Sequence, residues 1–241
     1  MNTWLLWTIL CATGPSAGPA DAGHWQVDQR VSPAFKLQVC SAWANLPPVV
    51  VDTLRQEGVQ IELVPLLADA LPDLADQAPR GWPRGWTWKN VDAVHLPSSH
   101  RLVFAEWRLS LEGKIVPCNR IDGVFRHELG HAWDAAVSSD RLVSESPGFR
   151  LAYSKDLASM TPLQQRELAY FVQEFPAGRE ETVAEIFAIC LGGGSAIGKQ
   201  VELREAFSSV FDLIERDLVT DSKSTIASTS INSATQSAET D

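Results

Sequence analysis

The spacing of hydrophobic and polar residues differs between the two halves of the chain. In the first half, short segments rich in β-branched and aromatic residues alternate with turn-forming Pro, Gly and Ser, a pattern typical of strands. Strands are predicted at residues 35–39, 59–64, 91–96 and 102–107. The last two flank the turn Pro97-Ser98-Ser99-His100 and therefore predict a hairpin. These segments indicate a small N-terminal sheet.

In the second half, apolar residues recur at the three- and four-residue spacing of helices. Helices are predicted at residues 122–136, 162–174, 180–191 and 201–218, and two shorter ones lie among the strands of the first half, at residues 48–57 and 66–74. Asp122 and Thr161 are the expected N-caps of two of them, and Gly192-Gly193-Gly194 ends a third. The predicted fold class is α+β, with a small sheet followed by a mostly helical C-terminal part.

The two ends of the chain differ from its middle in composition. Residues 4–12 form an apolar run too short to span a bilayer, and Ala20-Asp21-Ala22 offers a small-residue cleavage pattern. Residues 1–22 are therefore predicted to be a signal peptide, although no Lys or Arg precedes Arg30. Ser, Thr and Ala dominate residues 220–241 and predict a disordered tail. Residues 23–219 would then form the single domain of a secreted or periplasmic protein.

The composition and net charge of the chain limit the classes of molecule that it is expected to bind. The 241 residues are 45% hydrophobic and 21% charged, as in globular proteins, and the formal net charge is −10. No run rich in Lys or Arg is present in the sequence, so nucleic acid and anionic membrane surfaces are poor candidate partners. We expect no stable membrane insertion and a monomer.

The cysteines do not predict a disulfide scaffold. If Cys11 is removed with the signal peptide, three cysteines remain, which is an odd number. Cys190 lies in an apolar helical segment, where a buried thiol is common, so Cys40 and Cys118 are the expected pair.

The residues with the clearest chemistry are His127-Glu128-Leu129-Gly130-His131, which read HExxH. Residues four apart on a helix share a face, so His127 and His131 can direct two imidazoles at one metal ion. Glu128 can then reach a water on that metal and act as general base. The pattern predicts the catalytic centre of a zinc peptidase, with a peptide or protein as substrate. By chance, the same letters could fall on an ordinary helix, but the apolar flanks would make unpaired imidazoles costly.

A catalytic zinc needs a third protein ligand. Glu181 and Glu185 lie four residues apart on a later predicted helix, and either can complete the set, with the other hydrogen-bonding a ligand from behind. Alternatively, both are ordinary acids near a helix N-terminus. Asp134, one turn after His131, either orients that imidazole or is a solvated capping acid.

The aromatic loop ahead of the motif and two histidines outside it can each be interpreted in more than one way. The tryptophans of the loop at residues 81–88 either line a substrate cleft or cap a small core, and the core is the commoner place for them. His95 and His100 are interpreted as a strand residue and a turn residue rather than ligands.

The sequence resembles the catalytic domain of the anthrax lethal factor family, which includes small secreted Pro-Pro endopeptidases. The resemblance is carried by residues 127–134, HELGHAWD, and by residues 181–188, ETVAEIFA, and extends loosely over 37–191. It implies a zincin-like domain of the gluzincin type, with His127, His131 and Glu181 as zinc ligands. It also implies that Glu128 is the general base and that Glu185 supports the ligands from behind. The ExxxE pattern of that family favours Glu181 over Glu185 as the ligand.

One residue of that family pattern is missing. The family has a tyrosine a few residues before the third ligand, where it stabilises the oxyanion, but residues 174–178 contain none. Tyr170, eleven residues before Glu181, is the nearest and is our candidate for this role. The alternative to an enzyme is a secreted pseudo-peptidase, a binding module whose zinc site is structural or idle. The missing tyrosine favours that alternative, whereas Glu128, which a structural site does not need, favours the enzyme.

Overall fold

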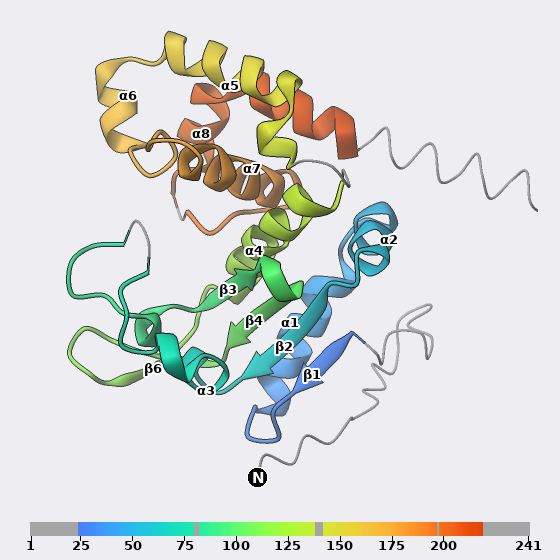
Figure 1. The fold of residues 1–241 in the computed structure, drawn as a ribbon, viewed down its shortest axis with the longest axis vertical. Coiled ribbons are helices and arrows are strands. Elements are labelled where there is room, and N and C mark those ends of the chain that lie inside the picture. The colour runs from blue at the N-terminus through green and yellow to red at the C-terminus, as the bar shows by residue number, and fades with distance from the viewer. Residues whose placement is uncertain (1–23, 80–81, 138–141, 197, 219–241) are drawn as a thin grey trace, which may run out of the picture.

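The structure is a computed structural model that describes residues 24–79, 82–137, 142–196 and 198–218. The predicted signal peptide and the predicted disordered tail lie outside the described residues, so both stay predictions. Figure 1 shows a sheet with flanking helices in one half of the molecule, a helical half beside it, and the long helix α4 between them. Within the described ranges, no helix has the length and apolar character needed to cross a membrane.

The main sheet has four strands in the order β1-β2-β4-β3. β1, β2 and β4 run parallel, and β3 pairs antiparallel with β4 at one edge. The predicted hairpin and the predicted strand at 59–64 are confirmed. The elements of this half are β1 (Trp25–Val27), α1 (Pro33–Ala44), α2 (Pro48–Gln56), β2 (Gln60–Val64), α3 (Leu67–Ala70), β3 (Ala93–Leu96), β4 (Arg101–Ala105), and the hairpin of β5 (Trp107–Leu109) and β6 (Ile115–Pro117), with 3-10 turns η2 (Pro72–Leu74), η3 (Trp88–Asn90) and η4 (Pro97–Ser99).

The predicted strand at 35–39 is wrong, because this segment lies inside α1. Pro33 occupies the first turn of that helix, and the hydroxyl of Ser32 accepts the Phe35 N–H at 3.2 Å as an N-cap. Phe35, Val39 and Ala42 follow at spacings of four and three and are buried on one face. A helix therefore buries its apolar residues better than a strand would.

The two faces of the sheet belong to different apolar clusters, because successive strand residues point to opposite sides. Leu102 and Phe104 of β4 face the main core, which includes buried residues of α1, α2 and α4. Val103 and Ala105 face a smaller cluster that also holds Cys118 and packs against Trp82 and Trp88. Cys118 is a free thiol on the face away from α1, which carries Cys40, so the predicted disulfide between them is wrong.

The helical half follows α4. Its elements are α4 (Ile121–Ala136), the 3-10 turn η5 (Val143–Glu145), α5 (Pro147–Ser159), α6 (Pro162–Glu167), α7 (Ala177–Cys190) and α8 (Gln200–Ala206), with a further helical stretch at 208–218. α4 begins one residue before Asp122, so Arg120 rather than Asp122 occupies the N-cap position. The predicted helix at 201–218 is interrupted by a turn at Phe207.

The helix predicted at 162–174 is shorter than expected. Thr161 forms the predicted cap with Gln164, but α6 ends at Glu167. Beyond it, the Phe171 carbonyl accepts the Tyr153 hydroxyl at 2.7 Å and the Thr182 hydroxyl at 3.1 Å. These contacts tie the segment between α6 and α7 to both α5 and α7, and the chain forms turns up to α7.

Candidate active site

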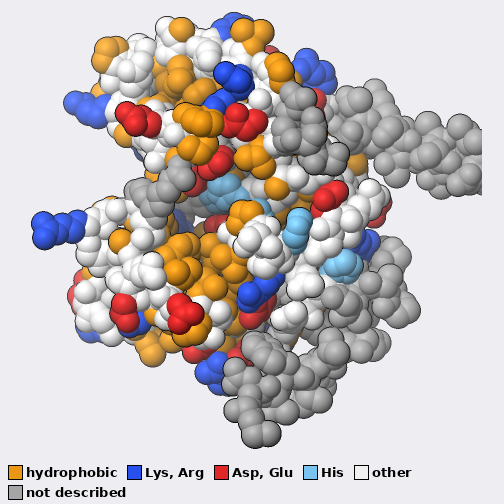
Figure 2. Space-filling view, in the orientation of Figure 1, with side chains coloured by type: hydrophobic (Ala, Val, Ile, Leu, Met, Phe, Trp, Pro, Cys, Tyr) orange, Lys and Arg blue, Asp and Glu red, His pale blue; other side chains and the backbone are white. Residues whose placement is uncertain are grey.

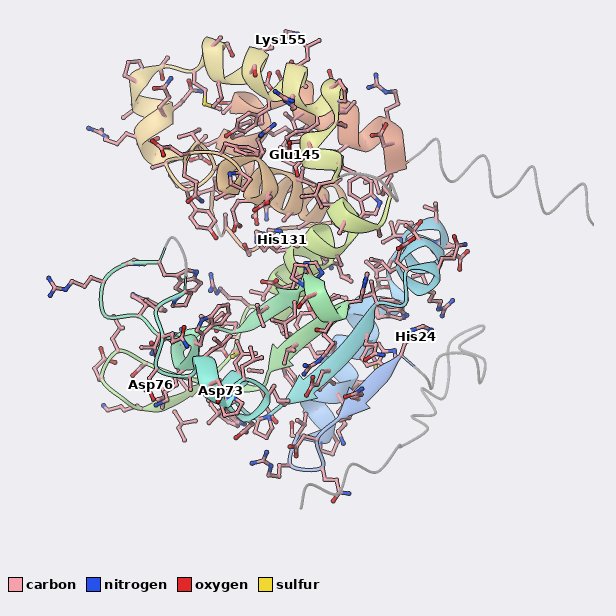
Figure 3. The ribbon with its side chains drawn as sticks, in the orientation of Figure 1. His24, Asp73, Asp76, His131, Glu145 and Lys155 are labelled. Carbon is pink, nitrogen blue, oxygen red and sulfur yellow. The ribbon has the colours of Figure 1, made fainter. Side chains whose placement is uncertain are left out.

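A cleft of about 780 Å³ lies between the edge strand β3 and the helical half. Figure 2 shows this hollow with histidine side chains at its floor and hydrophobic side chains along one wall. In Figure 3, His131 lies between the sheet half and the helices of the other half. The floor comes from α4, one wall from β3 and the tryptophan loop, and the opposite wall from α7 and the turn before it.

The two helices that meet at the floor, α4 and α7, pack unusually closely. Gly130 lies against the backbone of Ala184, and a Cβ built on Gly130 would lie 2.6 Å from the Ala184 Cα. The glycine inside the HExxH motif is therefore required by the packing of this helix on its neighbour. Close packing brings the acidic side chains of α7 within reach of the histidines of α4.

The structure brings His127, His131 and Glu181 together. One donor atom from each lies within 4.8 Å of the others. Oε2 of Glu181 is 3.2 Å from Nε2 of His127 and 3.6 Å from Nε2 of His131. Sequence spacing within α4 and close packing between α4 and α7 together produce this cluster.

The donor set fits a metal ion such as zinc, which binds histidine nitrogen and carboxylate oxygen. Oε2 of Glu181 is buried and has no hydrogen-bond partner among the described residues, although two imidazole nitrogens lie close to it. A buried carboxylate oxygen without a partner is costly unless a cation compensates it. A metal bound by these three atoms would remove that cost.

The protonation of the cluster is coupled. Burial raises the pKa of the Glu181 carboxyl, but the two imidazoles outweigh burial and hold that pKa well below its usual range. Burial lowers the pKa of both His127 and His131, and the Glu181 carboxylate outweighs it, so both pKa values are raised. A metal bound here would compete with protons for these nitrogens, so its binding would weaken as the pH falls.

Glu185 lies behind His127 and is fully buried. Its Oε2 lies 2.8 Å from Nδ1 of His127, and it also accepts the N–H and the hydroxyl of Ser195 at 3.1 and 2.8 Å. Its Oε1 accepts the Ala196 N–H at 2.7 Å. Every oxygen of Glu185 is therefore occupied, in contrast to Oε2 of Glu181, and neither glutamate is an ordinary solvated acid.

Glu128 lines the cleft beside the donor cluster. Burial, together with the charge of Glu181, raises the pKa of its carboxyl, while His131, His127 and the backbone N–H of His95 act in the opposite direction. A raised pKa suits a carboxylate that must take up a proton and release it again near neutral pH.

Tyr170 reaches the cleft from the turn between α6 and α7. Although 39% of Tyr170 is exposed, desolvation of its hydroxyl, the charge of Glu181 and a hydrogen bond to Glu181 raise the pKa of that hydroxyl, so the phenol stays protonated and can donate. Tyr153, the other tyrosine, is buried and donates to the Phe171 carbonyl. Of the two, Tyr170 is the one at the cleft.

Asp134 is buried at the end of α4, so the solvated alternative is wrong. Its Oδ1 accepts the Ser144 N–H at 2.7 Å and its Oδ2 accepts the Ser144 hydroxyl at 2.8 Å. Burial raises the pKa of Asp134 to about 6, against the lowering effects of Ser144 and of the His131 charge. The contact with Ser144 secures η5 to α4, and orientation of His131 by Asp134 stays a prediction.

The tryptophan loop and the two histidines outside the motif lie in different places relative to the cleft. Trp82 and Trp88 both pack against the smaller apolar cluster and line the cleft, so the predicted role in a small core is confirmed and contact with a substrate stays a prediction. His95 belongs to β3, as predicted, and its ring stacks on that of His131 at 6.5 Å between centroids. His100 lies in the turn after η4.

Sequence reasoning missed the groups that hold Glu185. The Gly192–Gly194 run predicted only the end of a helix, whereas Ser195 and Ala196 directly after it bind the Glu185 carboxylate. Arg120 was also missed. It lines the cleft, donates to Asp92 at 3.3 Å and reaches the Ser195 carbonyl at 3.4 Å. A polar residue directly after a glycine run was the only sequence signal.

Comparison with solved structures identifies a similar fold. The structure of the Pro-Pro endopeptidase from Paenibacillus alvei matches this chain with a TM-score of 0.54. The match covers 80% of this chain and 96% of that one, at 18% sequence identity. The chain has a zincin-like α+β fold. Neither models of known protein families nor sequences of characterised proteins match the chain.

Proposed function

We propose that this protein is an exported zinc-dependent endopeptidase. The observation that carries the proposal is the donor cluster of His127, His131 and Glu181, with Glu128 beside it in the same cleft. The zincin-like fold and the structural likeness to a Pro-Pro endopeptidase support it. Export is supported by the signal-peptide pattern of residues 1–22, and the net charge of −10 fits a protein that works alone in solution.

Each group of residues in the cleft has its own role in the proposed hydrolysis of the peptide bond. Bound zinc would polarise the scissile carbonyl and acidify the attacking water. Glu128 takes a proton from that water and delivers it to the leaving amine, a transfer for which its raised pKa is suited. The peptide lies in the cleft between β3 and the Tyr170 wall, where the apolar side chains of Trp82 and Trp88 exclude water.

Tyr170 is the proposed oxyanion donor. It is a protonated phenol at the cleft, held near Glu181, and so it takes the place of the tyrosine missing from residues 174–178. Arg179, the cation nearest to that stretch in sequence, is engaged with Glu145 at 3.3 Å and lies over the Phe175 ring, so it is a weaker candidate.

The second candidate function is a secreted binding module with an idle zinc site. It is favoured by the absence of a tyrosine at residues 174–178. A binding module has no need for a general base, so this alternative gives no role to Glu128, which lies in the cleft.

The test uses the full chain reconstituted with zinc, a peptide library, and the matched variants Glu128→Gln and Glu128→Asp. An endopeptidase cleaves internal peptide bonds and loses at least about a hundred-fold of kcat in Glu128→Gln while keeping its zinc. Glu128→Asp, which keeps a shorter base, retains more activity. Zinc-bound wild type without turnover would establish the binding module instead, and turnover that survives Glu128→Gln would refute the proposed role of Glu128.

A further inference from the structure

The glycine run after α7 leads into a segment with an unexpected number of contacts to the candidate centre. Residues 193–196 direct three donors at the Glu185 carboxylate. They are the Ser195 N–H at 3.1 Å, the Ser195 hydroxyl at 2.8 Å and the Ala196 N–H at 2.7 Å. Three donors from two consecutive residues make a cradle for a single carboxylate.

This cradle is fixed to α4 from its other side. The Gly193 carbonyl accepts from Arg126 at 3.4 Å, and the Ser195 carbonyl accepts from Arg120 at the same distance. A Cβ on Gly123 would overlap the Gly194 carbonyl, and a Cβ on Gly194 would overlap the Glu185 carboxylate. The lack of side chains at these two glycines lets the segment pass between α4 and Glu185.

The carboxylate held in this way determines which nitrogen of His127 is available. Nδ1 of His127 lies 2.8 Å from the Glu185 carboxylate, which favours a proton on Nδ1 and leaves Nε2, which faces Glu181, as the nitrogen for a metal. Groups behind a ligand imidazole fix its orientation and its basicity, and their loss weakens metal binding about 10- to 100-fold.

We propose that residues 193–196, with Ser195 as the main donor, orient Glu185 and thereby set the metal affinity of the candidate centre. Ser195 is a positioning residue in this scheme, since it contacts Glu185 and acts on the metal only through His127. The inference rests on the proposed function, because it assumes that the donor cluster binds zinc.

The test measures the Kd for zinc of the full chain by competition with a chromophoric chelator. Thermal unfolding of the zinc-free protein is measured beside it. Ser195→Ala removes the hydroxyl and is expected to raise the Kd about tenfold, and Gly194→Ala displaces the carboxylate and is expected to raise it about a hundred-fold. Ser195→Thr keeps the hydroxyl and is expected to restore the wild-type Kd.

Two matched controls separate the cradle from general effects of the substitutions. Ser208→Ala changes an exposed serine, and Gly148→Ala adds a Cβ where nothing lies within 4 Å. Both are expected to leave the Kd for zinc unchanged. In the zinc-free state, Ser195→Ala is expected to keep a cooperative unfolding transition only slightly below that of wild type, because it loses one hydrogen bond to the buried Glu185 carboxylate.

The outcomes distinguish this inference from the function it rests on. If wild type binds zinc tightly and Ser195→Ala binds it equally well, the inference is overturned and the peptidase proposal stands. The same holds if Ser195→Ala lowers only the unfolding temperature of the zinc-free protein, which is a structural effect. A wild type that binds no zinc overturns both proposals.

Discussion

The helices α4 and α7 both contribute pairs of side chains four residues apart to the candidate centre, and the two pairs behave differently. On α4, His127 and His131 direct Nε2 atoms at the same point. On α7, Glu181 presents an oxygen without a hydrogen-bond partner among the described residues, whereas Glu185 has both oxygens occupied. Spacing therefore puts side chains on one face of a helix. The partners that tertiary structure supplies distinguish Glu181 from Glu185.

The largest expected effect is the loss of zinc on removal of the Glu181 carboxylate. We expect wild type to bind about one zinc per chain and Glu181→Ala to lose stoichiometric binding, because two histidines alone do not hold a catalytic zinc. Zinc content after dialysis against a weak chelator measures this. Glu180→Ala, which removes the adjacent acid of α7, is the matched control and should keep its zinc.

Glu185→Ala decides whether the two glutamates have the roles assigned to them. It should weaken zinc binding without abolishing it, because Glu185 acts through His127. If Glu185→Ala loses the metal while Glu181→Ala retains it, the roles of the two glutamates must be exchanged.

The next expected effect is a loss of turnover on substitution of Tyr170, in the turn that precedes α7. Tyr170→Phe removes a protonated hydroxyl from the cleft and should lower kcat about a hundred-fold with little change in zinc content. Tyr153→Phe is the control, because its hydroxyl bonds the Phe171 carbonyl inside the core and should affect stability rather than kcat. Full turnover in Tyr170→Phe would show that another group stabilises the oxyanion.

The difference between α4 and α7 also explains what could be predicted from sequence. The five residues of HExxH are local, and a helix alone places His127 and His131 together. The choice between Glu181 and Glu185 depends on Ser195 and Ala196, which approach only after the chain turns back at the glycine run. The residues by themselves did not show which of the two glutamates is the metal ligand. Only the resemblance to a known family favoured Glu181.

Among the elements, errors occurred where a short apolar pattern fits more than one structure. The segment at 35–39 fits a strand locally, but Val39 and Ala42 continue a helical stripe capped by Ser32. The helix predicted at 162–174 ends early, and the turns that follow it are bound through the Phe171 carbonyl to side-chain hydroxyls of α5 and α7. These are long-range effects, whereas the hairpin of β3 and β4 depends on neighbouring residues and was predicted correctly.

A fourth prediction tests the contact between the two helices. Gly130→Ala places a Cβ 2.6 Å from the Ala184 Cα, so α4 and α7 must separate. We expect the free energy of unfolding of the zinc-free protein to fall by about 1–3 kcal/mol in urea titration. Gly148→Ala, with open space around it, should stay within about 0.5 kcal/mol of wild type. An unchanged stability of Gly130→Ala would mean that the helices can move apart at no cost.

The smallest expected effect lies at the end of α4, where Asp134 is buried against Ser144. Burial raises the pKa of Asp134 to about 6 from its ordinary value of 3.8, so between these pH values the folded state binds more protons than the unfolded state. Stability must then fall as pH rises through this window. One pH unit of this range corresponds to about 1.4 kcal/mol. We therefore expect zinc-free wild type to lose about 1 kcal/mol of stability between pH 5 and pH 7 relative to Asp134→Asn, as measured by urea unfolding at each pH. The opposite slope would mean that the hydrogen bonds from Ser144 outweigh burial and keep Asp134 ionised at the end of α4.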